Sequence, residues 1–468
     1  MTTASSFDDD LARLDALGTA QAIRDGELTA AEVVEAAIAR AEKLDGELGA
    51  IATPDFDRAR RLAPSRTGPF GGVPTFVKDM TDVAGIPTRN GSQAFATAAP
   101  ATKTSPIAQQ LFDLGLVALG KSSLPEFGFT PSTEFPEDEP TRNPWNLDRT
   151  PGGSSGGAGA LVASGVVPIA HGQDGGGSVR IPAACNGLVG LKPTRGRLLT
   201  DPHAKLLPLN IVTDGVLTRT VRDTAAYYVE AERLHRPRRL PPLGDVSQPL
   251  VRRLRIGALI DSPSGVAADE PTRRVFDETV ALLEGLGHEV HPVEPPVGEE
   301  FAEDFIHYWS MMAWAVTYGG KVLFDTSFHR DRLLPVTHGL SDRFKANLRR
   351  TPGSIVRLRR SAQRTAAQFA ELDVVLSPTL SHLPPSLGHL GTHHEFHVLF
   401  PRVEEWVGYT PLANATGDPA ISLPLGHDEE TNLPIGMMLS APRGADGLLL
   451  RLALELEGAQ PFRSLADG

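Results

Sequence analysis

The sequence predicts an α/β fold, because short buried strands alternate with amphipathic helices along the 468-residue chain. The clearest example is the run Ile256–Ile260, Asp269–Glu284 and His288–Pro292, which has a strand, helix and strand pattern. Residues 105–121 likewise indicate a helix followed by the buried strand Leu116–Leu119. Hydrophobic residues make up 41% of the chain and charged residues 22%, which is typical of a globular protein with a large core.

The other elements can be placed in chain order. Thr29 and Glu32 form a capping box, which predicts a helix that starts there and ends near Gly46. Gly71–Asp79 indicates a turn and a short apolar strand that ends in Lys78, although lysine is seldom buried without a partner. The later elements are a helix and a strand within 156–174, a short helix within 181–191, a helical region at 301–370, strands at 373–379, 420–424 and 434–439, and a closing helix at 448–456.

Composition excludes several classes of function. The net charge of −12 and the pI near 5.6 argue against a nucleic-acid or anionic-membrane partner, since phosphates are bound by clustered Lys and Arg. The single cysteine, Cys185, excludes an internal disulfide and a cysteine-based metal cage, and its apolar context indicates an inert thiol. We find no signal peptide and no apolar run long enough to span a membrane, and therefore expect a cytoplasmic protein.

Two local patterns resemble known motifs but lack the surrounding residues that those motifs need in order to function. Gly115–Ser122 fits the phosphate-binding G-x-x-x-x-G-K-S pattern, but the residues between its glycines are apolar, so we interpret them as a buried strand that ends near Lys121. The segment His393–His397 contains three histidines, yet the H-E-x-x-H spacing of zinc hydrolases fails because no histidine follows at position 398. We expect no metal site there and interpret the segment as a polar surface loop.

The stretch Thr150–Arg180 contains two glycine-rich turns that carry serines, Gly152–Gly157 and Asp174–Ser178. Dense glycine lets the backbone approach a ligand, and successive N–H groups can then bind an oxyanion beside a nucleophilic hydroxyl. The first turn also satisfies G-x-S-x-G, the nucleophile elbow of an α/β-hydrolase esterase with Ser154 as nucleophile, but no strand precedes it. A Ser178 site with His171 and Asp174 is a further alternative.

Taken together, the motifs resemble those of the amidase signature family over nearly the whole chain. They are Gly71–Asp79 with its lysine, Asn143–Asn146, Gly152–Gly157, Asp174–Arg180, Gly190–Gly196, Pro419–Pro424 and Leu433–Gly436. The resemblance implies one large domain over 1–468, with a central mixed, twisted sheet covered by helices on both faces and a core motif region at 71–200. It is strongest to the bacterial branch that includes 6-aminohexanoate cyclic-dimer hydrolases.

The resemblance also implies a Ser–cis-Ser–Lys triad: Ser178 as nucleophile, Ser154 as the cis-peptide serine, and Lys78 as base. The implied oxyanion donors are the amides of Gly175, Gly176 and Gly177 together with that of Ser178, and the implied supporting residues are Ser155, Asp174 and Arg180. Because only a neutral lysine accepts a proton, we expect burial to lower the pKa of Lys78. Gln173 and Gly175 depart from the family pattern, in which many members have Thr and a bulkier residue.

The predicted function is therefore the hydrolysis of a linear or cyclic small-molecule amide, without a cofactor or metal. We expect the variable segments 127–142, 301–370 and 390–414 to set specificity, with Phe129, Trp309, Trp314 and Trp406 in the substrate pocket. The glutamine-hydrolysing subunit of an amidotransferase uses the same signature, and a binding or scaffold protein could retain the fold. The sequence is compatible with a homodimer.

Overall fold

The computed structural model describes residues 2–135, 139–200, 204 and 207–467. Its largest element is a mixed sheet of eight strands in the order β4-β6-β5-β10-β11-β9-β7-β8. The strands are β4 (Ile169–Asp174), β5 (Val189–Lys192), β6 (Thr213–Thr218), β7 (Arg255–Ala258), β8 (Glu289–Pro292), β9 (Val374–Pro378), β10 (Ala420–Asp428) and β11 (Leu433–Ser440). Neighbours from β4 to β9 are antiparallel, whereas β7 runs parallel to both β9 and β8.

A second sheet continues beside β4. It has three strands, β1 (Ile51–Pro54), β3 (Val117–Ser122) and β2 (Pro74–Lys78), with β3 in the middle. The strand β2 lies along β4. A hydrogen bond joins the two strands, in which the Thr75 hydroxyl donates to the Ile169 carbonyl at 2.9 Å. This places Lys78, the last residue of β2, close to the end of β4, where the Asp174–Ser178 turn begins.

Fifteen α-helices are assigned within the described residues. They are α1 (Asp10–Arg13), α2 (Ala16–Arg24), α3 (Ala30–Leu48), α4 (Phe56–Leu62), α5 (Pro106–Asp113), α6 (Gly156–Ala163), α7 (Arg180–Asn186), α8 (Val221–Leu234), α9 (Glu270–Gly285), α10 (Glu299–Leu323), α11 (Pro335–Ala346), α12 (Thr351–Gln368), α13 (Phe396–Trp406), α14 (Pro411–Thr416) and α15 (Asp446–Ala459). None of these helices is long and apolar enough to cross a membrane.

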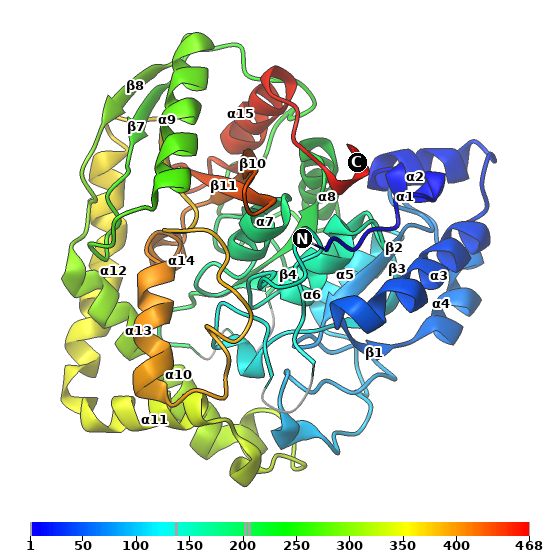
Figure 1. Cartoon of the computed structure of the whole chain (residues 1–468), viewed down its shortest axis with the longest axis horizontal. Helices are drawn as coiled ribbons and strands as arrows, with labels where there is room; N and C mark the ends of the chain where they lie inside the picture. Colours follow the sequence, from blue (N-terminus) through cyan, green and yellow to red (C-terminus); the bar gives the residue numbers. More distant parts are fainter. Residues whose placement is uncertain (1, 136–138, 201–203, 205–206, 468) are drawn as a thin grey trace.

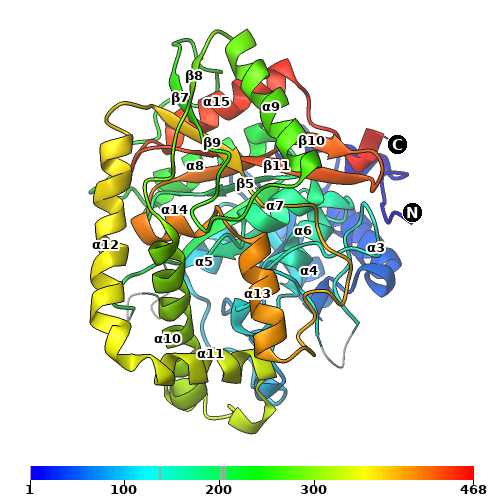
Figure 2. The same cartoon turned by 60° about the vertical axis from the view of Figure 1, so that its left-hand side comes forward.

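Both faces of the large sheet are buried. Successive side chains of a strand point to opposite sides of a sheet, so neighbouring residues of β4 and β6 enter different cores. Ile169 and Val216 pack into one core with α8, α9 and α15, whereas Ala170 and Leu217 pack into another with α3 and α6. In Figure 2, α10, α11 and α13 lie below the strands of the large sheet, α12 runs along the left edge, and both chain ends lie at the right edge. Figure 1 shows α3 and α4 on the opposite side of the molecule from α12. The predicted α/β fold is confirmed.

Two local expectations are settled by the strand and helix ends. Val117–Leu119, between Gly115 and Gly120, belong to β3 rather than to a phosphate-binding loop. Lys121 is buried within the same strand, with its Nζ atom 3.4 Å from Asp79 Oδ1. The helix that starts after Thr29 ends at Leu48, two residues beyond Gly46, in agreement with the predicted end near Gly46. It stops there because Gly49 adopts a left-handed conformation with φ of 58°, which suits glycine.

Candidate active site

The buried end of β2 brings a lysine to the first glycine-rich turn. Lys78 retains 1% of its surface, and its Nζ atom lies 2.7 Å from Ser154 Oγ and 3.0 Å from Ser155 Oγ. The carbonyl oxygen of Gln173, next to the second turn, lies 3.4 Å from the same nitrogen. The lysine thus contacts the Ser154 turn directly and reaches the last residues of β4.

Burial changes the protonation of this lysine. Removal of the ammonium group from water lowers the pKa of Lys78 from its ordinary value of 10.5 to about 7, and the charges of Asp174 and Asp214 oppose this shift only in part. A large fraction of the lysine is therefore neutral near pH 7 and able to accept a proton. This agrees with the expectation drawn from its position on an apolar strand.

The first turn is not a nucleophile elbow. No strand lies within residues 143–155, and α6 begins directly after Ser155, so the strand that an elbow requires is missing. The peptide bond between Gly153 and Ser154 is cis. Gly128 packs against this turn so closely that a Cβ atom there would lie 2.8 Å from Ser154 Oγ.

The second turn is organised by the carboxylate of Asp174. Its Oδ1 atom accepts a hydrogen bond from the Gly177 amide at 2.8 Å, and Gly177 adopts a φ of 131°. Gly177 was expected to be an oxyanion donor, but this amide is occupied by the carboxylate, so the expectation is corrected. Within the described part of the chain, the amides of Gly175, Gly176 and Ser178 have no protein acceptor.

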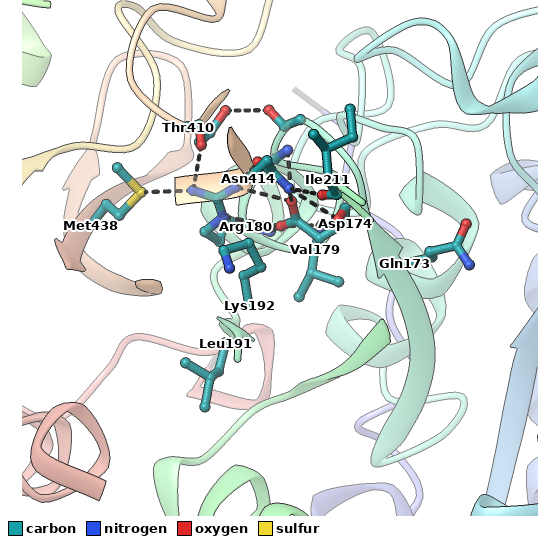
Figure 3. Close-up of polar contacts among 12 residues, drawn as sticks. Gln173, Asp174, Val179, Arg180, Leu191, Lys192, Ile211, Thr410, Asn414 and Met438 are labelled. Carbon is teal, nitrogen blue, oxygen red and sulfur yellow. Dashed lines mark hydrogen bonds and ion pairs between the residues drawn. The ribbon is translucent and has the colours of Figure 1, made fainter. Parts of the chain in front are cut away.

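The Asp174 carboxylate is held by a buried network that consists of Arg180 and of Thr410 and Asn414 from the C-terminal part of the chain (Figure 3). Arg180 and Asp174 form an ion pair at 2.9 Å with both side chains fully buried. Arg180 also donates to the Asn414 side chain at 2.6 Å and to the Thr410 carbonyl at 2.8 Å. Asn414 donates to both the backbone and the carboxylate of Asp174, at 3.0 and 2.9 Å.

The network determines the charge of its central carboxyl group. Burial alone raises the pKa of Asp174, but the Arg180 charge and the hydrogen bonds from Arg180 and Asn414 outweigh burial and hold this pKa well below its usual range. Asp174 is therefore ionised at neutral pH and accepts the amide hydrogen bonds that shape the turn.

A cavity of about 470 Å³ opens onto Ser178 and Gly176. Ser178 keeps 7% of its surface exposed, and its hydroxyl has no hydrogen-bond partner among the described residues. The wall comes mainly from the segments 128–131, 263–266, 299–309 and 400–411, and most of it is apolar. The expected specificity segments supply three of these four, although residues 136–138 of the segment 127–142 lie outside the described residues. The loop 263–266 was not foreseen.

Of the four aromatic residues expected in the substrate pocket, two line the cavity and two do not. Phe129 and Trp309 line the cavity, where their rings meet edge to face at 5.9 Å. Trp314 was wrongly placed: it lies five residues further along α10, on another side of the helix, against Phe344. Trp406 was also wrongly placed, because its ring is fully buried beside the cavity wall and its Nε1 donates to a backbone carbonyl at 2.9 Å.

The remaining candidates from the sequence have other partners. His171 faces Asp214 at 3.2 Å and not Asp174, so these two residues do not form the alternative triad with Ser178. Burial raises the pKa of the Cys185 thiol, which has no role in the cavity. The part of the chain that the structure describes contains no group of three or more His, Cys, Asp or Glu side chains arranged to hold a metal ion.

Two residues of the network, Thr410 and Asn414, were missed by the sequence analysis. They lie more than 220 residues after the turn they support. Thr410 precedes the short helix α14 and Asn414 lies within it, and neither position has a sequence pattern that identifies such a role. Only the sheet brings them close, since α14 precedes β10, which pairs with β5, and β5 follows α7.

Comparison with known proteins agrees with this architecture. The family model described as Amidase matches residues 32–450. The putative amidase AmiC of Mycobacterium tuberculosis is 49% identical over 459 residues, covering 97% of this chain and 96% of that protein. The 6-aminohexanoate-cyclic-dimer hydrolase of Paenarthrobacter ureafaciens is 33% identical over 478 residues, covering 96% of this chain and 95% of that one.

A solved structure described as 6-aminohexanoate cyclic dimer hydrolase complexed with substrate has the same fold. It superimposes with a TM-score of 0.87 at 30% sequence identity, covering 98% of this chain and 100% of that chain. The mixed sheet with helices on both faces is thus shared over the full length of both chains.

Proposed function

Because the chain belongs to the amidase family, we propose that it hydrolyses an uncharged linear or cyclic carboxamide with an apolar substituent, through an acyl-enzyme on Ser178. The observation that carries this proposal is the 2.7 Å contact between Lys78 Nζ and Ser154 Oγ, next to the cavity that Ser178 lines. A lysine with a pKa of about 7 is matched to proton transfer near neutral pH.

Ser154 is the relay between nucleophile and base, because a hydroxyl can donate one hydrogen bond and accept another. Neutral Lys78 accepts the Ser154 proton, and Ser154 accepts the proton of Ser178 as Ser178 Oγ attacks the amide carbon. This relay requires the Ser178 side chain to turn its hydroxyl toward Ser154 Oγ, and that hydroxyl is held by no other hydrogen bond among the described residues. Supporting this route, Gly128 both lines the cavity and packs against Ser154 Oγ.

The attack places a negative charge on the former carbonyl oxygen. The amides of Gly175, Gly176 and Ser178 are the proposed donors to that oxygen, since the Gly177 amide is bound to Asp174. When the tetrahedral intermediate collapses, the C–N bond breaks and the proton held by Lys78 returns through Ser154 to the leaving nitrogen. Water then attacks the ester of Ser178 and gives a proton through Ser154 to Lys78. When the bond between the acyl carbon and Ser178 Oγ breaks, that proton returns through the relay to Ser178 Oγ, and the carboxylic acid leaves.

The cavity wall favours an apolar, uncharged substrate. Aromatic and aliphatic side chains surround Ser178, and no Lys, Arg or His of the described residues lines the cavity. Its charged members are four carboxylates, Glu299, Glu303, Glu404 and Glu405. Burial raises the pKa of Glu404, while the charge of Arg343 opposes this effect and that of Glu303 adds to it. A substrate carboxylate would be repelled there, because like charges destabilise each other in a partly desolvated site.

A panel of amides tests this function. The release of amine is measured for a neutral anilide, its carboxylate-bearing analogue, a neutral aliphatic amide, a cyclic diamide and glutamine, with wild type and Ser178→Ala. We expect hydrolysis of one or more of the neutral amides, at least tenfold weaker turnover of the anionic analogue, and no turnover by Ser178→Ala.

Hydrolysis of glutamine alone would instead assign the chain to the amidotransferase class. Undiminished turnover by Ser178→Ala would overturn the acyl-enzyme route, and equal turnover of the anionic and neutral anilides would overturn the proposed selectivity for uncharged substrates.

A further inference from the structure

The peptide unit that joins Gly176 to Gly177 is held at both of its ends by hydrogen bonds. On one side, the Gly177 N–H donates to Asp174 Oδ1 at 2.8 Å. On the other, the Gly176 carbonyl accepts a hydrogen bond from the hydroxyl of Thr410 at 2.6 Å. Thr410 is fully buried and comes from the segment just before α14, which is remote from the turn in sequence.

We propose that Thr410 is a positioning residue for the amide hydrolysis described above: its hydroxyl fixes the orientation of the Gly176–Gly177 peptide and thereby that of the neighbouring amides. Three consecutive glycines permit many backbone conformations, so this turn does not hold one orientation by its own preference. The Asp174 carboxylate holds the N–H end and Thr410 holds the C=O end. The amides of Gly176 and Ser178 flank this peptide, and their directions depend on it.

Close packing supports the assignment. A Cβ atom at Gly177 would lie 2.3 Å from Thr410 Oγ1, so the hydroxyl sits directly against the turn. The backbone of Thr410 is itself held, because its carbonyl accepts from Arg180 at 2.8 Å. Thr410 is therefore fixed to the same arginine that pairs with Asp174.

Thr410 also connects the turn to the substrate wall. Its neighbours Gly408 and Pro411 line the cavity, whereas Thr410 itself points away from the cavity to the Gly176 carbonyl. The hydrogen bond from Thr410 therefore reaches the turn from the segment that also forms part of the cavity wall. Since the oxyanion forms only after attack, loss of this bond should lower kcat and leave KM nearly unchanged.

Three variants test the role on the neutral amide that wild type hydrolyses. Thr410→Val removes the hydroxyl at almost constant shape, Thr410→Ser retains it, and Thr279→Val removes a buried hydroxyl on α9 that donates to a carbonyl of its own helix at 2.7 Å. Removal of an oxyanion donor costs about 10²–10³ in kcat, so its misplacement in Thr410→Val should cost about tenfold or more. We expect KM within twofold of wild type, near wild-type kcat in Thr410→Ser, and no effect in Thr279→Val.

A second readout separates positioning from general damage. A trifluoromethyl ketone forms a hemiketal oxyanion on the nucleophile, so its Ki should rise in Thr410→Val by the same factor by which kcat/KM falls. The pH profile should keep its midpoint, because Lys78 is untouched. Thr410→Ala removes the same hydroxyl and supplies the comparison if Thr410→Val does not fold.

The proposal is overturned if Thr410→Val keeps its kcat, if Thr410→Ser loses as much as Thr410→Val, or if the ketone Ki does not change. Failure of the proposed function has a different signature, because Ser178→Ala would then keep its activity whatever stands at position 410.

Discussion

Lys78 Nζ and Ser154 Oγ lie 2.7 Å apart, although 76 residues separate them in the chain. The contact forms because β2 runs beside β4, and its last residue is thereby buried at the start of both glycine-rich turns. A lysine in this position has no carboxylate ion pair within the described residues, so burial controls its protonation. The predictions below follow from this contact and from the cavity and network around it.

The first prediction concerns pH. Burial lowers the pKa of Lys78 to about 7, and the neutral form is the active base, so kcat/KM for an uncharged amide should rise as pH increases through about 7 and level off above it. The measurement is a pH–rate profile between pH 5 and 10, the range in which this titration is complete. A rate that falls between pH 6 and 8 would contradict the base assignment, as would an unchanged profile in Lys78→Ala.

A substitution at Gly128 should displace the relay hydroxyl. A Cβ atom there would lie 2.8 Å from Ser154 Oγ, and the residue has a φ of 68°. Gly26 has a similar φ of 75° but open space around it, so Gly26→Ala reproduces the backbone cost without the contact. We expect Gly128→Ala to reduce kcat by about tenfold or more, as for loss of a general acid–base contribution. Equal kcat in the two variants would show that Ser154 is not in the proton path.

Two tryptophans of α10 form a matched pair for the cavity. They are five residues apart, which places them about 140° from each other around a helix with 3.6 residues per turn. Trp309 lines the cavity, whereas Trp314 packs outside it. Burial of a large apolar side chain is worth about 1.5–3 kcal/mol, so Trp309→Ala should raise KM for an apolar amide by tenfold or more. Trp314→Ala should change KM by less than twofold, and the reverse order would contradict the placement of the cavity.

The buried ion pair should control stability more strongly than its surface counterparts. Removal of one partner of a buried pair costs about 3–5 kcal/mol, so Arg180→Met should lower the free energy of unfolding, measured in urea at pH 7, by about that amount. Because the pKa of Asp174 is depressed in the folded state, its contribution is present above the ordinary carboxyl pKa and is lost as the pH falls below it. Glu35→Gln, which breaks the exposed pair with Arg60, is the control and should cost far less. Equal losses of unfolding free energy in the two variants would contradict the prediction that the buried pair matters more than the exposed one.

Much of the fold follows from local patterns, because strand and helix periodicity is set by neighbours in the chain. The capping box at Thr29, the β7–α9–β8 unit and the β10–β11 pair are all present in the structure, with ends shifted by a few residues. The end of α3 lies two residues beyond Gly46, because a glycine within a helix is tolerated and the helix stops only at Gly49, which has a positive φ.

The site was predictable to the extent that its residues belong to contiguous motifs. Lys78 and the two serine turns were found in this way, and the structure places the lysine against Ser154. Sequence reasoning missed Thr410 and placed Trp314 wrongly, because the role of each residue depends on which elements pack together in the folded chain. Nothing in the structure explains the departure at Gly175, because a Cβ atom there would lie 3.4 Å from the Trp309 ring, which is ordinary van der Waals contact.

The central claim is that Ser178, and not Ser154, is the nucleophile, and a fluorophosphonate probe tests it most directly. The probe forms a stable phosphonyl ester with an activated serine, and the modified residue is identified by intact mass and peptide mapping. We expect one adduct per chain on Ser178 in wild type, slower formation of the same adduct in Ser154→Ala, and none in Ser178→Ala. An adduct on Ser154 in wild type, or undiminished labelling of Ser178→Ala, would contradict the account.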